Sequence, residues 1–267
     1  MNISIGFRMK FKTRQQEELE ETIKQYATLF ERYEIKVTDS FDNVEYVRDV
    51  VLLSEKYLKS QFSFHLPKNI LEDERELKKC ELLFQILQDM GYEGNLITHI
   101  PTDIDFDNYK SILEKLSQII PDKSILLLEN IVVEDCMGYL IKIDKLFDSI
   151  NKSNIGNIKF CLDFGHLFFS FYKNNKMQEE ELQQLSKCTS ILKNVKEIHL
   201  HDFNTELDHL HLGEGLLNLE DLIHFILVNK IECPIILEIT ISNPNEDGYQ
   251  QIELVKRSLS SKKEKEQ

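Results

Sequence analysis

The stretch Ser124-Ile125-Leu126-Leu127-Leu128-Glu129 is an uninterrupted apolar run that ends in a carboxylate. A second run of this kind, Pro234-Ile235-Ile236-Leu237-Glu238, lies near the end of the chain. A strand buried on both faces reads as a continuous apolar run, and such strands are typical of parallel sheets covered by helices. Both runs therefore predict central strands of a parallel sheet, each with a glutamate at its carboxyl end.

Strand-like segments alternate with helix-like segments along the whole chain. The predicted strands are residues 3–9, 34–38, 61–65, 95–100, 124–129, 158–163, 195–201 and 234–238. The predicted helices are residues 15–33, 44–58, 73–87, 109–120, 140–150, 179–192, 219–229 and 250–259. The third helix shows the signal most clearly, because Asp73 and Glu76 match a capping box and apolar residues follow at helical spacing. Strict alternation of this kind predicts parallel strands joined by helices.

Eight strand–helix units in 267 residues fit one closed barrel, which takes ~250 residues. An open doubly wound sheet is the alternative, but no G-x-G-x-x-G follows the first strand, so a dinucleotide site is not indicated. No linker rich in Pro, Gly or Ser divides the chain. We therefore predict an α/β protein with a single parallel eight-stranded (β/α)8 TIM barrel over residues 1–259. A charged, disordered tail is expected at residues 260–267.

The composition narrows the class of protein. There are 32 basic and 46 acidic side chains, so the formal net charge is 32 − 46 = −14, which disfavours nucleic-acid and anionic-membrane partners. No apolar run approaches the ~18 residues of a membrane span, and the N-terminus lacks a signal-peptide pattern. The 5 cysteines form no C-x-x-C pair, which favours a reduced setting. A cytoplasmic protein is expected, and a homo-oligomer is compatible with the pattern.

Imidazoles and carboxylates recur at the carboxyl ends of the predicted strands, where barrel enzymes carry their active sites. Those at the strand ends are His65, His99, Glu129, Asp163, His199, His201 and Glu238, and those just beyond are His166, Asp202, His209 and His211. His224 is the one histidine predicted to lie on a helix. Scattered polar residues would not repeatedly choose the same end of successive strands, so the pattern predicts one site.

The chemistry of these side chains suits a divalent cation. Carboxylate oxygen and neutral imidazole nitrogen are good ligands for Mn²⁺, Co²⁺, Zn²⁺ or Fe²⁺. His199 and His201 need not share a metal, because two residues along a strand span ~6.6 Å. His211 is as compatible with an ordinary loop position as with a role in the site.

Five motifs together resemble the xylose-isomerase-like TIM barrel superfamily, which includes sugar isomerases and epimerases and the endonuclease IV group. The motifs are Leu128-Glu129-Asn130, Cys161-Leu162-Asp163-Phe164-Gly165-His166, His199-Leu200-His201-Asp202, His209-Leu210-His211-Leu212-Gly213-Glu214-Gly215 and Leu237-Glu238. The metal ligands implied by the resemblance are Glu129, Asp163, His199 and Glu238. The implied cofactor is a divalent metal such as Mn, Co, Zn or Mg. His166 would lie beside it and contact the substrate.

The isomerase branch implies a sugar or sugar-phosphate substrate and proton transfer next to a carbonyl. Glu129 and Glu238 would act as acid and base as well as ligands, and His166 would stabilise the enediolate oxygen. The partner would be a small sugar-like molecule rather than nucleic acid or a membrane. The residues expected to contact it are His65, His99, Arg8 and His209.

Two alternatives remain open. The endonuclease IV branch implies a zinc phosphodiesterase that acts on abasic DNA, with His65, His99 and His209 among the ligands of a three-zinc cluster. Against that branch, Leu207 stands where it has an aspartate ligand, and Leu66-Pro67-Lys68-Asn69 stands where it has a Tyr-Leu pair that enters DNA. The other alternative is a barrel that binds a metal or ligand without catalysis.

Overall fold

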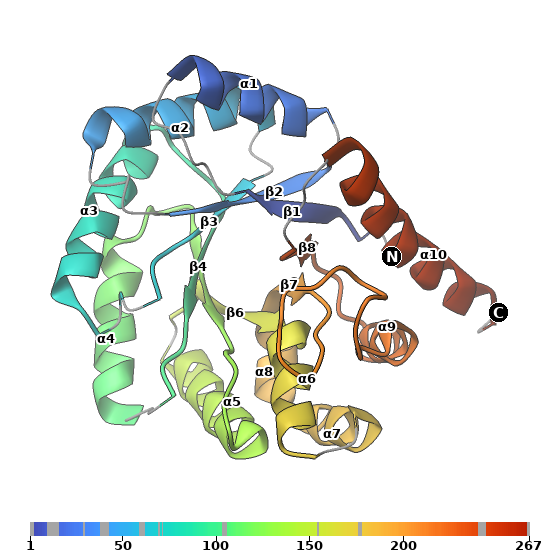
Figure 1. Ribbon diagram of the computed structural model, residues 1–267. Helices are drawn as coiled ribbons and strands as arrows, with labels where there is room; N and C mark the ends of the chain where they lie inside the picture. Colours follow the sequence, from blue (N-terminus) through green and yellow to red (C-terminus); the bar gives the residue numbers. More distant parts are fainter. Residues whose placement is uncertain are drawn as a thin grey trace.

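Eight parallel strands close into a barrel in chain order within the described part of the chain, and helices surround them (Figure 1). The computed structural model describes residues 3–9, 16–28, 30–37, 43–58, 62–68, 70, 72–102, 106–153, 155–175, 178–239 and 244–265. The barrel closes because the first strand pairs with both the second and the eighth. The predicted (β/α)8 TIM barrel is therefore confirmed.

Each predicted strand is present, with bounds within two residues of the prediction. The strands are β1 Ile5–Met9, β2 Arg32–Lys36, β3 Phe62–His65, β4 Asn95–His99, β5 Ile125–Glu129, β6 Ile158–Asp163, β7 Val195–Leu200 and β8 Ile235–Leu237. Strand β2 begins two residues earlier than predicted, which places Glu34 in the middle of the strand. Glu34 matters below, because its side chain points into the barrel and contacts His199.

The helices follow the prediction less closely. They are α1 Gln16–Ala27, α2 Val44–Leu58, α3 Glu74–Asp89, α4 Phe106–Ile119, α5 Cys136–Lys152, α6 Phe164–Lys173, α7 Gln178–Leu185, α8 Thr189–Asn194, α9 Leu219–Val228 and α10 Tyr249–Lys265, with a π-turn η2 at Pro244–Gly248. Asp73 caps α3 as predicted, although it accepts from the amide of Arg75. Helix α10 extends to Lys265, beyond the predicted end at Leu259. Disorder of residues 260–267 stays a prediction.

The prediction of a single helix between successive strands was wrong between β6 and β7. In the described chain, three helices lie there instead of one. The helix that was missed, α6, starts directly after β6 because the Asp163 side chain accepts from the amide of His166 at 2.7 Å. Residues 164–171 of this helix are all buried. The helix begins at the residue after the strand, so no turn or polar loop in the sequence marks it as a separate element.

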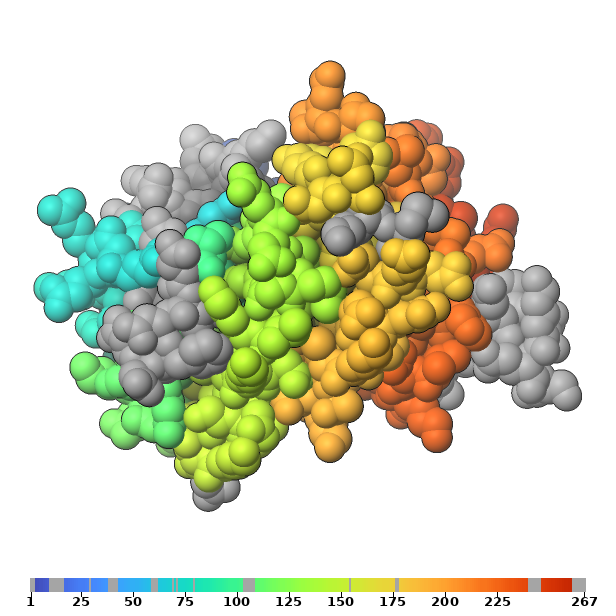
Figure 2. All heavy atoms as spheres, turned by 90° about the horizontal axis from the view of Figure 1, so that it is seen from below, coloured from blue at the N-terminus to red at the C-terminus, as the bar shows by residue number. Residues whose placement is uncertain are grey.

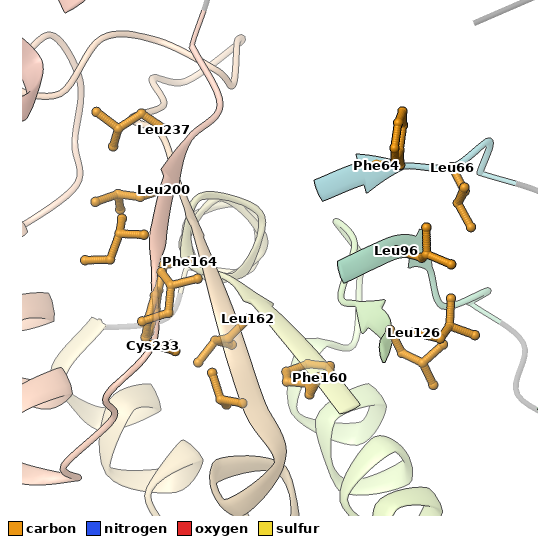
Figure 3. Close-up of a cluster of buried hydrophobic side chains, with 14 of the residues drawn as sticks. Phe64, Leu66, Leu96, Leu126, Phe160, Leu162, Phe164, Leu200, Cys233 and Leu237 are labelled. Atoms are coloured by element: carbon orange, nitrogen blue, oxygen red, sulfur yellow. The ribbon is translucent and has the colours of Figure 1, made fainter. Parts of the chain in front are cut away.

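The outer face of the barrel packs under the helices. Side chains at alternate strand positions, such as Phe160 and Leu162 of β6 and Leu200 of β7, belong to one large buried cluster (Figure 3). Helices α5 and α7 lie side by side over this layer, and in Figure 2 their segments form adjoining green and yellow surfaces. None of the helices among the described residues is both long and apolar enough to cross a membrane.

A small cluster of apolar side chains, the plug, lies inside the barrel just below the site. The plug consists of Ile97, Leu127 and Cys161, all fully buried. Side chains two residues apart on a strand share a face. The next inward positions on β4, β5 and β6 are therefore His99, Glu129 and Asp163. The alternation of the strands thus delivers polar groups to one level directly above the plug.

Candidate metal centre and active site

Four buried side chains from four consecutive strands meet at the carboxyl end of the barrel. They are Glu129 of β5, Asp163 of β6, His199 of β7 and Glu238 just after β8. One candidate ligand atom of each lies within 4.8 Å of all the others. The Nδ1 atom of His199 is 2.6 Å from Glu238 Oε1 and 3.2 Å from Glu129 Oε1. The four residues predicted as metal ligands therefore form one compact group.

Several polar atoms of this group have no hydrogen-bond partner within the protein. Among the described residues, the buried atoms without a hydrogen-bond partner include Glu129 Oε1, Asp163 Oδ2, both carboxylate oxygens of Glu238 and both ring nitrogens of His199. Such atoms are costly to bury unless something satisfies them. A set of carboxylates with one imidazole suits a divalent cation. The residues present therefore fit the metal that the sequence implies.

The surroundings of Glu129 favour its ionised form despite its complete burial. Burial alone would raise the pKa of Glu129, but the neighbouring imidazoles of His99 and His199 hold that pKa well below its usual range. Asp163 follows the same pattern, because His166 and His201 outweigh the effect of burial and lower the pKa of Asp163 to about 2. Metal ligands must be deprotonated, and these two carboxylates meet that condition at neutral pH.

His65 and His99 face the second oxygen of Glu129. The Nε2 atom of His65 lies 2.8 Å from Glu129 Oε2, and its Nδ1 lies 3.0 Å from the Leu66 carbonyl. A carbonyl only accepts, so Nδ1 carries the hydrogen and Nε2 turns its lone pair toward the carboxylate. Burial and the charge of Arg8 lower the pKa of His65 to about 4. The neutral ring needs a cation beside Nε2, and His99, at 3.2 Å from the same oxygen, completes a second candidate ligand group.

A third group contains His166, His201 and His209. The Nδ1 atom of His166 donates to the Asn130 carbonyl at 3.2 Å, and that of His209 donates to the Glu238 carbonyl at 2.9 Å. Both rings therefore leave Nε2 as the atom able to bind a ligand. Burial lowers the pKa of His209 to about 3, with a smaller contribution from His201. His201 was predicted to be a less likely metal ligand than His199. It joins the site in a different group from His199.

The local structure explains how His166 reaches the site. Asn130 donates to the Asp163 carbonyl at 2.8 Å and accepts from the Asp163 amide at 2.9 Å, which ties the ends of β5 and β6 together. Asp163 then caps α6 and fixes its first turn. At Gly165 in that turn, a Cβ would overlap the imidazole of His201. Glycine is required there by close approach, and His166 lies on a helix rather than in the predicted loop.

The loop after β7 is organised by Asp202, whose side chain is buried. Its carboxylate accepts from the backbone amides of Phe203, Gly213, Gly215 and Leu217 at 2.8–3.0 Å. These bonds fold residues 203–217 back over the barrel mouth. The chain turns through a left-handed conformation at His209, with φ 56°, and this brings that ring to the site. His211 instead lies 3.8 Å from Glu214 and is outside the three groups.

A cavity of about 600 Å³ adjoins the two histidine groups, since His99, His166 and His209 line it. Its lining residues are Lys68, Glu72, His99, Ile100, Pro101, Thr102, Ile131, Val132, His166, Asp208 and His209. Among these lining residues, the one lysine, Lys68, is outnumbered by two carboxylates, Glu72 and Asp208. This wall is therefore not a basic surface. His99 and His166 belong both to this wall and to the ligand groups, which connects the cavity to the candidate metal centre.

Arg8 lies inside the barrel, where its guanidinium contacts the carboxylates of both Glu34 and Glu238. Its side chain is 13% exposed, and the predicted contact with substrate stays a prediction. Glu34 and Glu197 are fully buried beside the site, and they were missed in the sequence. The available signal for Glu197 was its position two residues before His199 on the same strand, so that the two side chains share a face.

Solved structures with the same fold include several sugar epimerases. A D-tagatose 3-epimerase-like protein has 18% identity and a TM-score of 0.68, covering 99% of this chain and 100% of its own. A D-allulose 3-epimerase from Methylomonas sp. has 14% identity and a TM-score of 0.69, covering 96% of this chain and 98% of its own. A 3-keto-D-glucoside 4-epimerase from E. coli has 13% identity and a TM-score of 0.64, covering 96% of this chain and 100% of its own. At these identities the likeness shows the fold.

The sequence itself places the chain in a family. No curated protein matches it. Residues 19–257 match the family described as "Xylose isomerase-like TIM barrel", a span that includes the four-residue group and both flanking histidine groups. The chain therefore belongs to the xylose isomerase-like TIM barrel family.

Proposed function

We propose that this protein is a divalent-metal-dependent isomerase or epimerase that moves a proton next to the carbonyl of a sugar-like substrate. The observation that carries the proposal is the group of Glu129, Asp163, His199 and Glu238, which a cavity large enough for a sugar adjoins through His99 and His166. The similarity in fold to sugar 3-epimerases and a 4-epimerase supports the same class of reaction. One lysine against two carboxylates in the wall favours a neutral sugar over a polyanion.

A bound divalent ion would polarise the substrate carbonyl and acidify the neighbouring C–H bond. Glu129 and Glu238 come from β5 and from the residue after β8, on different sides of the barrel mouth. In an epimerase, one carboxylate removes the proton from carbon and the other group returns a proton on the opposite face. His166 lines the cavity with Nε2 available, so it can hold a substrate oxygen as charge develops there.

Deuterium exchange tests this proposal. The protein is loaded with Mn²⁺ or Co²⁺ and incubated in D₂O with a panel of ketoses and ketose phosphates. Deuterium is expected at the carbon next to the carbonyl of at least one sugar. The E129Q variant should lose at least ~10²-fold in exchange rate, whereas H224Q, which changes an exposed histidine of α9, should keep full activity. Retention of metal without exchange of any sugar would refute the isomerase assignment.

A second candidate function is metal-dependent hydrolysis of a phosphate ester, favoured by the sharing of Glu129 between two ligand groups. Among the described residues, the buried carboxylates of the barrel interior outnumber its arginine: they are Glu34, Glu129, Asp163, Glu197 and Glu238, against Arg8. Buried charges need partners, and two divalent ions would balance this interior, −5 + 1 + 4 = 0. Sites with two metals are typical of phosphatases and nucleases.

The metal content per chain and one assay separate the two candidates. Two or more ions per chain, with cleavage of a phosphodiester such as an abasic-site duplex and no sugar exchange, would replace the isomerase by the hydrolase. One tightly held ion with sugar exchange and an intact duplex would exclude the hydrolase.

A further inference from the structure

The carboxylate of Glu34 lies on the far side of the His199 ring from the four-residue group. Its Oε2 atom is 2.9 Å from His199 Nε2, while His199 Nδ1 faces Glu238 at 2.6 Å and Glu129 at 3.2 Å. Both Glu34 and His199 are fully buried. The ring is therefore held between two sets of carboxylates, one on each nitrogen.

The two nitrogens of a neutral imidazole cannot do the same job. The nitrogen that binds a metal offers a lone pair, so the other must carry the hydrogen. A carboxylate that accepts this hydrogen fixes both the tautomer and the orientation of the ring. The contact between Glu34 and His199 has the distance of such a bond but not its alignment. Hydrogen bonds of this kind commonly tighten when a site is loaded.

Glu34 is itself held in place from the neighbouring strand. Arg8 and Glu34 are directly opposed in the register of β1 and β2, and both face into the barrel. The guanidinium of Arg8 contacts Glu34 and also Glu238 of the four-residue group. Arg8 thus links the carboxylate behind His199 to a carboxylate in front of it.

We propose that Glu34 is a positioning residue for His199, which holds the hydrogen on Nε2 and leaves Nδ1 free to bind the metal, and that Arg8 fixes Glu34 for this task. The inference rests on the proposed metal centre. It assigns roles to a residue that the sequence motifs did not mark and to an arginine that was expected to contact substrate.

Glu197 provides a matched control within the same interior. Its carboxylate is also fully buried and lies 3.5 Å from His199 Nε2. Its oxygens, however, accept from Asn95 at 2.9 Å and from Ser63 at 3.4 Å. Glu197 is therefore satisfied by other donors, and its replacement removes an equal charge without removing the contact that orients His199.

The test compares the full-length chain with E34Q and E197Q, using Co²⁺ as the probe. Competition with a chelator measures affinity, and the visible absorption of Co²⁺ reports its ligand geometry. E34Q is expected to bind Co²⁺ ~10–100-fold more weakly with an altered spectrum, and E197Q to resemble the parent protein. The ¹⁵N resonances of His199 in the Zn²⁺-loaded parent protein should show the hydrogen on Nε2.

The outcomes separate this inference from the proposed function. If the parent protein binds no divalent ion, the metal centre and this inference both fail. If the parent binds Co²⁺ but E34Q binds equally well, or E34Q and E197Q weaken binding equally, only the positioning role is overturned. The ¹⁵N measurement uses the parent chain, so it decides the matter even if E34Q does not fold, and a hydrogen on Nδ1 would refute the role.

Discussion

Asn130 and Asp163 hold each other through two hydrogen bonds, one from the Asn130 amide to the Asp163 carbonyl at 2.8 Å and one from the Asp163 backbone to Asn130 Oδ1 at 2.9 Å. Asn130 follows the last residue of β5, and Asp163 is the last residue of β6. The pair therefore joins two adjacent strands at the level of the candidate metal centre. Glu129 directly precedes Asn130, and Asp163 is itself a member of the pair. The two hydrogen bonds therefore fix the separation of the Glu129 and Asp163 backbones.

Replacement of Asn130 by Ala should therefore affect both stability and the site. The backbone amide and carbonyl of Asp163 lose their partner, which costs ~1–3 kcal/mol for each unsatisfied group. Chemical denaturation measures the free energy of unfolding, and chelator competition measures affinity for Co²⁺. N157A is the control, since Asn157 donates one bond to Ser117 away from the site. Equal losses in the two variants would show that the paired bonds have no special role.

Replacement of Gly165 by Ala should displace His201, because the added methyl group overlaps that ring. Overpacking of this kind costs ~1–3 kcal/mol, seen as a lower midpoint in denaturation. The double variant G165A/H201A should recover most of the loss, since the methyl group then has space.

The control for this pair is G156A. A Cβ at Gly156 meets nothing within 4 Å, so its stability should stay close to that of the parent. A stable G165A protein with an unchanged His201 resonance would contradict the close approach described above.

Replacement of Asp202 by Ala should release the loop that carries His209. Four backbone amides lose their acceptor, and the expected destabilisation is at least ~2 kcal/mol. Limited proteolysis should then cut within residues 203–217. D135A, which removes one cap bond to Gly138, should cost only ~1 kcal/mol and leave this loop resistant.

Metal affinity should rise with pH. Burial opposes the charged form of His199, but Cys161, Glu34 and Glu129 raise its pKa well above the usual value. The free ring thus carries a second proton at neutral pH, and a metal must displace it. Below the raised pKa, the apparent Kd should fall about tenfold per pH unit for each proton displaced. Calorimetry in two buffers of different ionisation enthalpy counts the protons. Affinity that does not change with pH would refute the displacement.

Much of the fold could be predicted because the deciding signals are local. The apolar runs ending in Glu129 and Glu238 indicated parallel strands, and parallel strands in a barrel present their carboxyl ends at one face. That geometry predicted one polar site at the barrel mouth, and the resemblance to the family implied Glu129, Asp163, His199 and Glu238 as the metal ligands within it. Helix α6 was missed because it begins at Phe164, immediately after the last residue of β6, so no connecting segment marks where the strand ends and the helix begins.

The sequence by itself determined which residue types stand at the strand ends, and with them the barrel and the chemistry of its mouth. Tertiary structure alone decided which atoms meet. Glu34 and Glu197 became part of the interior through the register of β2 and β7, and His201 joined His166 and His209 because Gly165 lets their elements approach. Such contacts depend on strand register and on a loop folded around Asp202, and these are set by packing between segments far apart in the chain.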